Sequence, residues 1–273
     1  MRHVSLGNLA SRVGTALIGL PALLAILFLA PAWAWAALVA AGLLVGWTEL
    51  QRLFAAREVA LMPVPGVALL ATFFAATADP GLAIQAWWPA ATLLLLASVV
   101  LRRSDFDASV RAAAATALVA AYLGGLGGTL SGLRTLAPSQ GDPWRVVMLC
   151  AIVMGSDTCA YFVGHALGRR RLAPSISPGK TVEGALGGLV GGVVGAAVVW
   201  RLALQSIPLA HALLLGAVVA ACGMFGDLFE SLLKRWAGIK DSGAVLPGHG
   251  GILDRIDGLL FGAPVLYYYF TWY

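Results

Sequence analysis

The sequence predicts an all-α integral membrane protein: polytopic, with about nine transmembrane helices, a cytoplasmic N-terminus and a C-terminus outside. The apolar composition, the long apolar stretches and the one-sided placement of Lys and Arg all support this prediction. The 273 residues are 60% hydrophobic and 11% charged, with a mean hydropathy of +0.86. An ordinary soluble domain is about 45 to 50% apolar and about 25% charged. Water alone is therefore excluded as the solvent of this chain.

Candidate spans follow one another along the whole chain. A spanning helix needs roughly 20 mostly apolar residues, and such stretches lie at about 13–30, 32–50, 61–78, 86–101, 112–133, 146–167, 183–200, 207–230 and 256–272. The first could also be a signal peptide, because Arg2 and Arg12 precede it. A helical hairpin is the simpler interpretation, since the apolar run continues beyond Pro31.

The positions of the cations predict the topology. If the N-terminus is inside, only Arg134, Arg145 and Arg201 of the 18 Lys and Arg residues fall outside. The inside loops hold the others, which are Arg2, Arg12, Arg52, Arg57, Arg102, Arg103, Arg111, Arg169, Arg170, Arg171, Lys180, Lys234, Arg235, Lys240 and Arg255. This positive-inside bias favours nine spans. The formal charge of +5 therefore reports topology and gives no reason to expect nucleic acid.

Two predicted spans carry glycine at four-residue spacing. These are Gly124, Gly128 and Gly132 in one, and Gly184, Gly188 and Gly192 with Gly187, Gly191 and Gly195 in the other. Small residues at this spacing let membrane helices approach closely, although a glycine-lined substrate path is an alternative. The three cysteines, Cys150, Cys159 and Cys222, lie in apolar stretches without metal-ligand spacing, so neither a zinc site nor a disulfide is expected.

Ionisable residues deep in helices or at helix mouths gather in the second half of the chain: Asp157, His165, Glu183, Asp227 and Glu230. A charge inside the bilayer costs several kcal/mol, about 2.5 to 3.5 at least, unless it is paired or hydrated. We therefore expect Asp157 and Asp227 to share a cavity. The first four spans are expected to be scaffold.

One helix face combines carboxylates, a hydroxyl and a cation. Asp227, Glu230 or Ser231, and Lys234 follow the helical spacing i, i+3/i+4, i+7. Such a face predicts contact with something charged. The alternative for Glu230 and Lys234 is a surface ion pair worth a few tenths of a kcal/mol.

The loop after this helix is rich in charge and glycine. It holds Lys240, Asp241, Gly243, Gly248, His249, Gly250, Gly251, Asp254, Arg255 and Asp257. Glycines let backbone N–H groups surround a phosphate, cations neutralise phosphate charge, and carboxylates such as Asp227 and Asp254 suit Mg²⁺. Asp254 and Asp257 could instead cap the last helix, and His249 could be a turn residue.

A third polar segment, residues 168–184, lies on the same predicted side. Its PGKT is not a Walker A motif, because Pro174 stands where that motif needs glycine. We expect Ser177 as N-cap and Pro178 as the first residue of the next helix. Lys180 and Thr181 would then lie at a helix end suited to phosphate. Arg169 to Arg171 could be topology markers alone.

The polar residues resemble a known signature, that of the phosphatidate cytidylyltransferase (CDP-diacylglycerol synthase) family. The matching positions are Ser231, Lys234, Arg235, Lys240, Asp241, Gly243, Leu246, Pro247, His249, Gly250, Gly251, Asp254, Arg255 and Asp257. The segments SDTCAYF, SPGKT and GDLFES are similar to that family too. The resemblance extends over most of the second half. The apolar stretches along the whole chain predict a single membrane domain, residues 1–273, with mainly scaffold spans in 1–145 and the catalytic half in 146–273.

The resemblance implies transfer of CMP from CTP to phosphatidate, giving CDP-diacylglycerol and pyrophosphate. It implies Mg²⁺, with a second cation as an option, at Asp227 and Asp254. The catalytic residues expected are Asp227, Asp254, Lys234, Lys240, His249 and Arg255; the substrate-binding residues are Asp157, Ser177, Lys180, Thr181, Ser231, Arg235, Asp241, Gly250, Gly251 and Asp257. CTP, phosphatidate and the lipid bilayer are the expected partners, with a homodimer as an option, no nucleic acid, and a site facing the cytoplasm from a bacterial inner membrane.

Two other interpretations remain open. A CTP-dependent lipid-alcohol kinase or another CDP-lipid synthase would need the same metal, nucleotide and bilayer. An ion-coupled transporter would use Asp157, Glu183 and Asp227 as a relay. The sequence shows no inverted repeat or second charge cluster to favour transport.

Overall fold

The computed structural model describes residues 19–78, 87–101, 105–136, 142–239 and 251–273. After a short helix, Gly19–Leu29, the elements are α2 (Ala32–Ala55), α3 (Pro63–Ala78), α4 (Trp87–Leu101), α5 (Phe106–Ala120), η2 (Ala121–Leu126), α6 (Gly127–Gly132), α7 (Pro143–Leu167), β1 (Arg171–Ala173), β2 (Ser177–Thr181), α8 (Val182–Leu202), α9 (Leu209–Ala237) and α10 (Leu253–Trp272). Each predicted apolar stretch coincides with helix in the described residues. The pair of short antiparallel strands is the exception to the all-α prediction.

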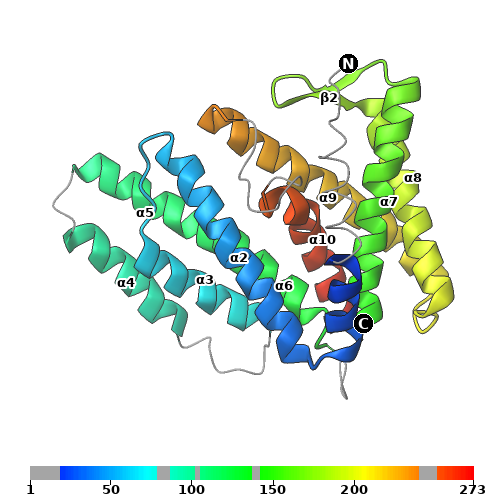
Figure 1. The fold of residues 1–273 in the computed structure, drawn as a ribbon, viewed down its shortest axis with the longest axis horizontal. Coiled ribbons are helices and arrows are strands. Elements are labelled where there is room, and N and C mark those ends of the chain that lie inside the picture. The colour runs from blue at the N-terminus through cyan, green and yellow to red at the C-terminus, as the bar shows by residue number, and fades with distance from the viewer. Residues whose placement is uncertain (1–18, 79–86, 102–104, 137–141, 240–250) are drawn as a thin grey trace.

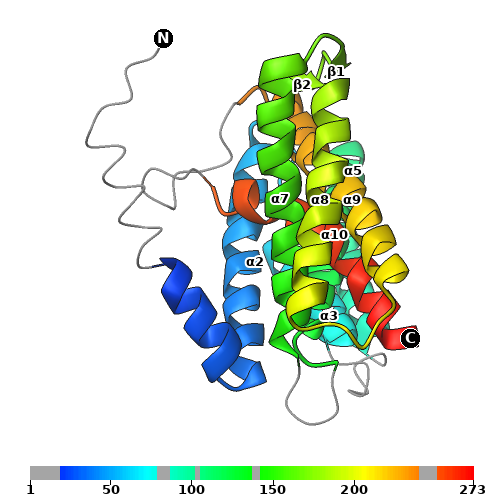
Figure 2. The ribbon, with the colours of Figure 1, turned by 90° about the vertical axis from the view of Figure 1, so that its right-hand side faces the viewer.

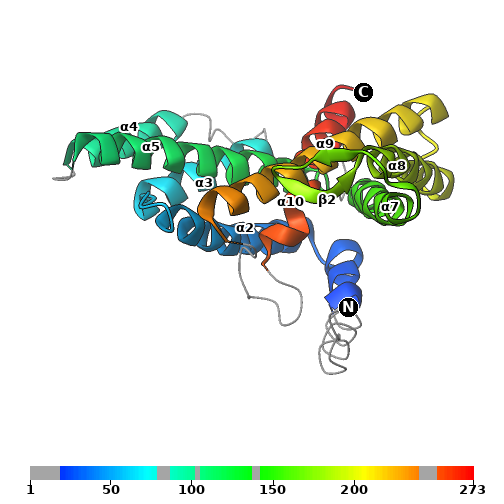
Figure 3. The same cartoon turned by 90° about the horizontal axis from the view of Figure 1, so that it is seen from above.

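The helices form two groups joined by α9 and α10. Helices α3, α4 and α5 lie on one side and α7 and α8 on the other, with α9 and α10 between them (Figures 1 and 3). The long helices α7 and α8 run side by side, and the β1–β2 hairpin covers one of their ends (Figure 2). A continuous buried apolar cluster includes residues of both halves, such as Leu43, Leu123, Leu149 and Leu260.

Five helical segments in the described residues are long and apolar enough to cross a membrane: Ala32–Ala55, Phe106–Gly132, Pro143–Leu167, Val182–Leu202 and Leu209–Ala237. The apolar helices Gly19–Leu29, α3 and α4 are shorter. A helix of 16 residues such as α3 extends only about 24 Å at 1.5 Å per residue, less than the hydrocarbon core of about 30 Å. The structure thus supports a membrane protein with several spans, while the number of nine crossings stays a prediction.

The glycines predicted to bring helices together lie at such contacts. A Cβ added to Gly128 would lie 2.5 Å from the carbonyl oxygen of Phe74 in α3, and one added to Gly191 would lie 2.7 Å from Sγ of Cys159 in α7. Real side chains cannot be accommodated at such distances without movement. The glycine-rich helices therefore pack as predicted, and the three cysteines are free thiols.

The junction between α5 and α6 is a π-helical turn, η2. It places Tyr122 in the interior, where its ring meets Phe229 of α9 and Phe261 of α10 at centroid distances of 5.3 Å and 5.9 Å. Single π-helical turns inside α-helices are frequent at functional sites. Through this contact the first half of the chain reaches the helices that carry the predicted site.

Candidate active site

Two adjoining cavities contain most of the predicted site residues that the structure describes. The larger, of about 680 Å³, is lined by Asp157, Ala160, Tyr161, Gly164, His165, Gly168, Arg171, Leu172, Ser177, Gly179, Lys180, Thr181, Gly184, Ala185, Met224 and Asp227. The smaller, of about 140 Å³, is lined by Asp157, Gly223, Asp227, Glu230, Lys234, Asp254, Asp257 and Gly258. Asp157 and Asp227 line both, which confirms that these two residues share a cavity.

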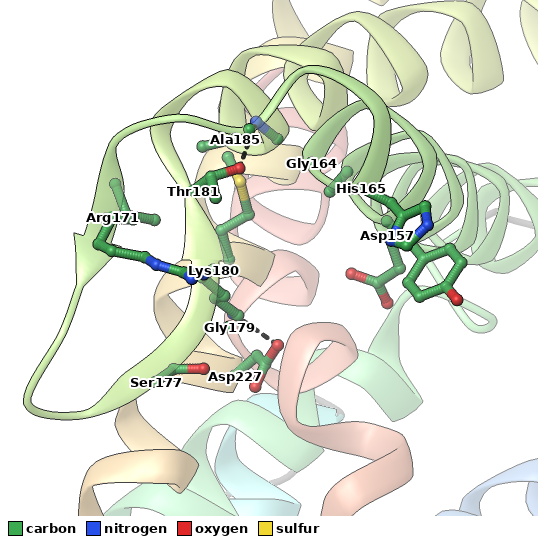
Figure 4. Close-up of a pocket in the computed structure, with 16 residues that line it drawn as sticks. Asp157, Gly164, His165, Arg171, Ser177, Gly179, Lys180, Thr181, Ala185 and Asp227 are labelled. Carbon is green, nitrogen blue, oxygen red and sulfur yellow. Dashed lines mark hydrogen bonds and ion pairs between the residues drawn. The ribbon is translucent and has the colours of Figure 1, made fainter. Parts of the chain in front are cut away.

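The β-hairpin closes one side of the larger cavity. Its strand β2 directs Lys180 toward α9, where Nζ lies 2.5 Å from Oδ2 of Asp227 (Figure 4). Asp157 faces this ion pair from α7 (Figure 4). Segments that are far apart in the sequence thus bring a cation and two carboxylates to one space.

The hairpin is held by hydrogen bonds at both of its ends. Glu183 accepts hydrogen bonds from the backbone N–H groups of Arg169 (3.0 Å) and Arg170 (3.2 Å). At the turn, Nε of Arg235 donates to the carbonyl oxygen of Ile176 at 3.3 Å. These contacts fix the position from which Lys180 reaches the cavity.

The predicted start of α8 is wrong. Ser177 and Pro178 belong to β2, and α8 begins at Val182 with Thr181 as its N-cap. Oγ1 of Thr181 accepts a hydrogen bond from the N–H of Gly184 at 3.1 Å. The misplacement has a physical cause: residues 177–181 pair with residues 171–173, and this pairing overrides the local Ser-Pro capping signal.

The smaller cavity is lined mainly by carboxylates. Five of its residues are Asp or Glu, and the one lysine among them, Lys234, contacts Asp254 at 2.5 Å and Glu230 at 3.4 Å. Partial burial acts to raise the pKa of Asp254, but hydrogen bonds with Glu230, Lys234 and the N–H of Gly251 outweigh it and lower the pKa to about 2. Asp254 is therefore a carboxylate at neutral pH.

The predicted polar face of α9 is confirmed. Asp227, Glu230 and Lys234 all line the smaller cavity, and Oγ of Ser231 donates to Oδ1 of Asp227 at 3.4 Å. The alternative ion pair of Glu230 with Lys234 does form, at 3.4 Å, but it is not a surface pair, because Glu230 is only 2% exposed. Lys234 also joins α9 to α10 through its contact with Asp254.

The start of α10 is stabilised by a residue that sequence reasoning missed. The oxygens of Glu49, a residue of α2 that is 0% exposed, accept hydrogen bonds from the N–H groups of Ile252 at 2.9 Å and Leu253 at 3.0 Å. The expectation that deep ionisable residues gather only in the second half is therefore wrong. A glutamate inside the apolar stretch 32–50 was the signal that could have found it. Asp254 and Asp257 line the smaller cavity. Asp254 accepts a hydrogen bond from the N–H of Gly251, and Asp257 accepts one from the N–H of Gly258.

Several predicted site residues lie apart from the cavities or outside the described residues. Arg235 and Arg255 are exposed and are not among the residues that line either cavity. Lys240, Asp241, His249 and Gly250 lie outside the described residues. Gly251 is buried and reaches the site through Asp254.

The donor set of the smaller cavity fits Mg²⁺. In the described residues, no group of three or more His, Cys, Asp or Glu is close enough to hold a metal ion alone. Mg²⁺ needs no such group, since it commonly binds through one or two carboxylates together with waters and substrate phosphates. Asp227 and Asp254 both line this cavity of about 140 Å³. Asp227 and Asp254 are suitable ligands.

Fold and site together define a helical membrane protein with a carboxylate- and lysine-lined site where α7, α9, α10 and the hairpin meet. A model of the Cytidylyltransferase family matches residues 10–273. The chain belongs to this family.

Curated relatives agree with this assignment. The chain is 41% identical over 178 residues to the phosphatidate cytidylyltransferase of Bacillus subtilis, covering 65% of both chains. It is 48% identical over 120 residues to the phosphatidate cytidylyltransferase of Thermotoga maritima, covering 42% of this chain and 44% of the relative. It is also 42% identical over 130 residues to the uncharacterized protein YnbB of Escherichia coli, covering 48% of this chain and 43% of the relative. The matches thus span less than two thirds of these relatives' lengths.

Proposed function

We propose that this protein transfers CMP from CTP to phosphatidate, giving CDP-diacylglycerol and pyrophosphate. The observation that carries the proposal is the pair of adjoining cavities, one closed by Lys180 and the other lined by five carboxylates, in a chain of the Cytidylyltransferase family. The relatives from Bacillus subtilis and Thermotoga maritima carry the name of this activity.

In the proposed reaction, a phosphate oxygen of phosphatidate attacks the α-phosphorus of CTP. The bond from that phosphorus to the β-phosphate oxygen breaks, and pyrophosphate leaves with the electron pair. A phosphate monoester is already an anionic nucleophile, so the protein mainly aligns the two substrates and neutralises charge. No covalent intermediate on the protein is needed.

The described side chains divide this work by charge. Lys180 and Lys234 are the lysines of the two cavities and serve the phosphates of CTP and the leaving pyrophosphate, and Arg171 is a further cation in the wall of the larger cavity. Asp227 and Asp254 would hold Mg²⁺, with a second cation as an option, and bound Mg²⁺ would neutralise phosphate oxygens. Asp157, Ser177 and Thr181 complete the wall of the larger cavity. Arg235, Lys240 and Arg255 keep the roles at substrate phosphates that the sequence signature implies. His249 keeps its proposed phosphate or acid–base role, and Asp241 stays a proposed substrate-binding residue.

The site is proposed to face the cytoplasm in a bacterial inner membrane, with nine crossings and the C-terminus outside. CTP would arrive from water, while phosphatidate would enter from the inner leaflet. The one-sided Lys and Arg distribution supports this orientation. Association into a homodimer is compatible with it.

Purified protein in lipid nanodiscs provides the test. With CTP, Mg²⁺ and phosphatidate, we expect stoichiometric pyrophosphate and CDP-diacylglycerol. In a parallel sample that contains a lipid alcohol in place of phosphatidate, formation of CDP and a phosphorylated lipid would instead indicate a kinase. Ion flux in liposomes without CTP, with no lipid product in its presence, would indicate a transporter.

A further inference from the structure

The feature that carries a further inference is the buried carboxylate of Glu49. This side chain belongs to α2, in the half of the chain expected to be scaffold, and it is 0% exposed. One oxygen accepts a hydrogen bond from the N–H of Ile252 and the other accepts one from the N–H of Leu253, residues more than 200 positions away in the sequence. Glu49 thus contacts the first turn of the helix that carries Asp254 and Asp257.

The chemistry of a helix start explains why a carboxylate suits this position. The first N–H groups of a helix have no partner inside it, and the helix dipole makes this end positive. In α10 the N-cap residue is Ile252, whose side chain makes no capping hydrogen bond. Glu49 therefore does from another helix what a capping side chain normally does locally.

Packing fixes the same turn a second time. Leu253 is 0% exposed, and a Cβ added to Gly46, one turn before Glu49, would lie 3.0 Å from Cδ2 of Leu253. Gly46 leaves room for the leucine side chain, while Glu49 holds its backbone. Together they fix where α10 begins relative to α2.

The turn that Glu49 holds leads directly into the smaller cavity. Asp254 follows Leu253 directly, and its carboxylate contacts Lys234 and the N–H of Gly251. Asp257 lies nearly one turn further and lines the same cavity. A shift of the first turn of α10 would move both carboxylates.

We propose that Glu49 is a positioning residue of the cation and phosphate site, acting through the first turn of α10. This role deepens the proposed function, and the activity measurement below rests on that function. Its cation-binding measurement needs no substrate. The competing explanation is that Glu49 only stabilises the fold.

Mn²⁺ binding followed by electron paramagnetic resonance separates the two. Outer residues that orient metal ligands typically change metal affinity about 10- to 100-fold when replaced. We expect Glu49→Ala to weaken Mn²⁺ binding about tenfold or more, and Glu49→Gln, which keeps one acceptor oxygen, to weaken it less. Glu58→Gln is the matched control, because Glu58 is an exposed glutamate just after the same helix.

Hydrogen exchange and activity complete the design. Exchange at residues 251–258 should rise in Glu49→Ala and stay unchanged in Glu58→Gln, and the Mg²⁺ concentration for half-maximal activity should rise in step with the loss of Mn²⁺ affinity. If Glu49→Ala does not fold, Glu49→Gln decides through the same titration. Unchanged Mn²⁺ affinity and Mg²⁺ dependence in folded variants, even with lower thermal stability, would overturn the proposal. Absence of Mn²⁺ binding in the unmutated protein would overturn it too, whereas absence of CDP-lipid alone would overturn only the proposed function.

Discussion

Nζ of Lys180 lies 2.5 Å from Oδ2 of Asp227, so a lysine of the β-hairpin forms an ion pair with a carboxylate that is proposed to hold Mg²⁺. The same arrangement recurs in the smaller cavity, where Lys234 contacts Asp254 at 2.5 Å. Each proposed metal ligand therefore has a lysine as its cation in this structure. A bound Mg²⁺ would take the place of the lysines at these carboxylates, and the lysines would then be free to contact phosphate oxygens of CTP.

This exchange predicts a specific role for Lys180. Lys180→Ala should lower kcat/KM for CTP about 10- to 100-fold, since hydrogen bonds to charged groups contribute about 1.5 to 3 kcal/mol. The measurement is pyrophosphate release at varied CTP. Arg170→Ala is the control, because Arg170 is a cation of the same segment that does not line the cavity. Equal loss in both variants would indicate a general effect of charge.

Replacing either proposed metal ligand should lower activity more than replacing either lysine. Asp227→Asn and Asp254→Asn keep the size of the side chain but remove its charge, and we expect each to lower kcat about 100- to 1,000-fold. Asp107→Asn changes an exposed aspartate paired with Arg111 and should leave activity unchanged. Full activity in either cavity variant, measured on membrane-inserted protein, would remove that residue from the metal site.

Close packing of α7 and α8 predicts a stability effect away from the chemistry. Gly191→Val would push a side chain against Gly155 and Cys159 of α7, and overpacking of this kind costs about 1 to 3 kcal/mol. The thermal unfolding midpoint in detergent should fall. Gly42→Ala, where a Cβ has nothing within 4 Å, should leave the midpoint unchanged or raise it. A midpoint that stayed constant in Gly191→Val would show that the two helices separate easily.

The corrected start of α8 predicts that Thr181 acts as a cap. Thr181→Val removes the hydroxyl that accepts the N–H of Gly184, at a cost of about 1 kcal/mol. Thr181→Ser keeps the hydroxyl and should keep most of the stability. Calorimetry of both variants makes the comparison; equal stability would contradict the capping role.

Much of the helical fold and part of the site followed from the sequence because both depend on local patterns. Apolar stretches of about 20 residues locate the helices, and the spacing from Asp227 to Lys234 sets their common face. What the sequence could not provide was the pairing of distant segments. Strand pairing moved Ser177 out of a helix start, and Glu49 acquired its role only through contact with residues more than 200 positions away.

Isotope transfer from CTP tests the central claim most directly. The protein in nanodiscs with phosphatidate and Mg²⁺ is given CTP labelled at either the α- or the γ-phosphate. The lipid is then extracted, and the label in it is measured. We predict that the α-label enters the lipid, that the γ-label leaves as pyrophosphate, and that Asp227→Asn lowers the rate of transfer about 100- to 1,000-fold. Label reaching the lipid only from the γ-phosphate would contradict it.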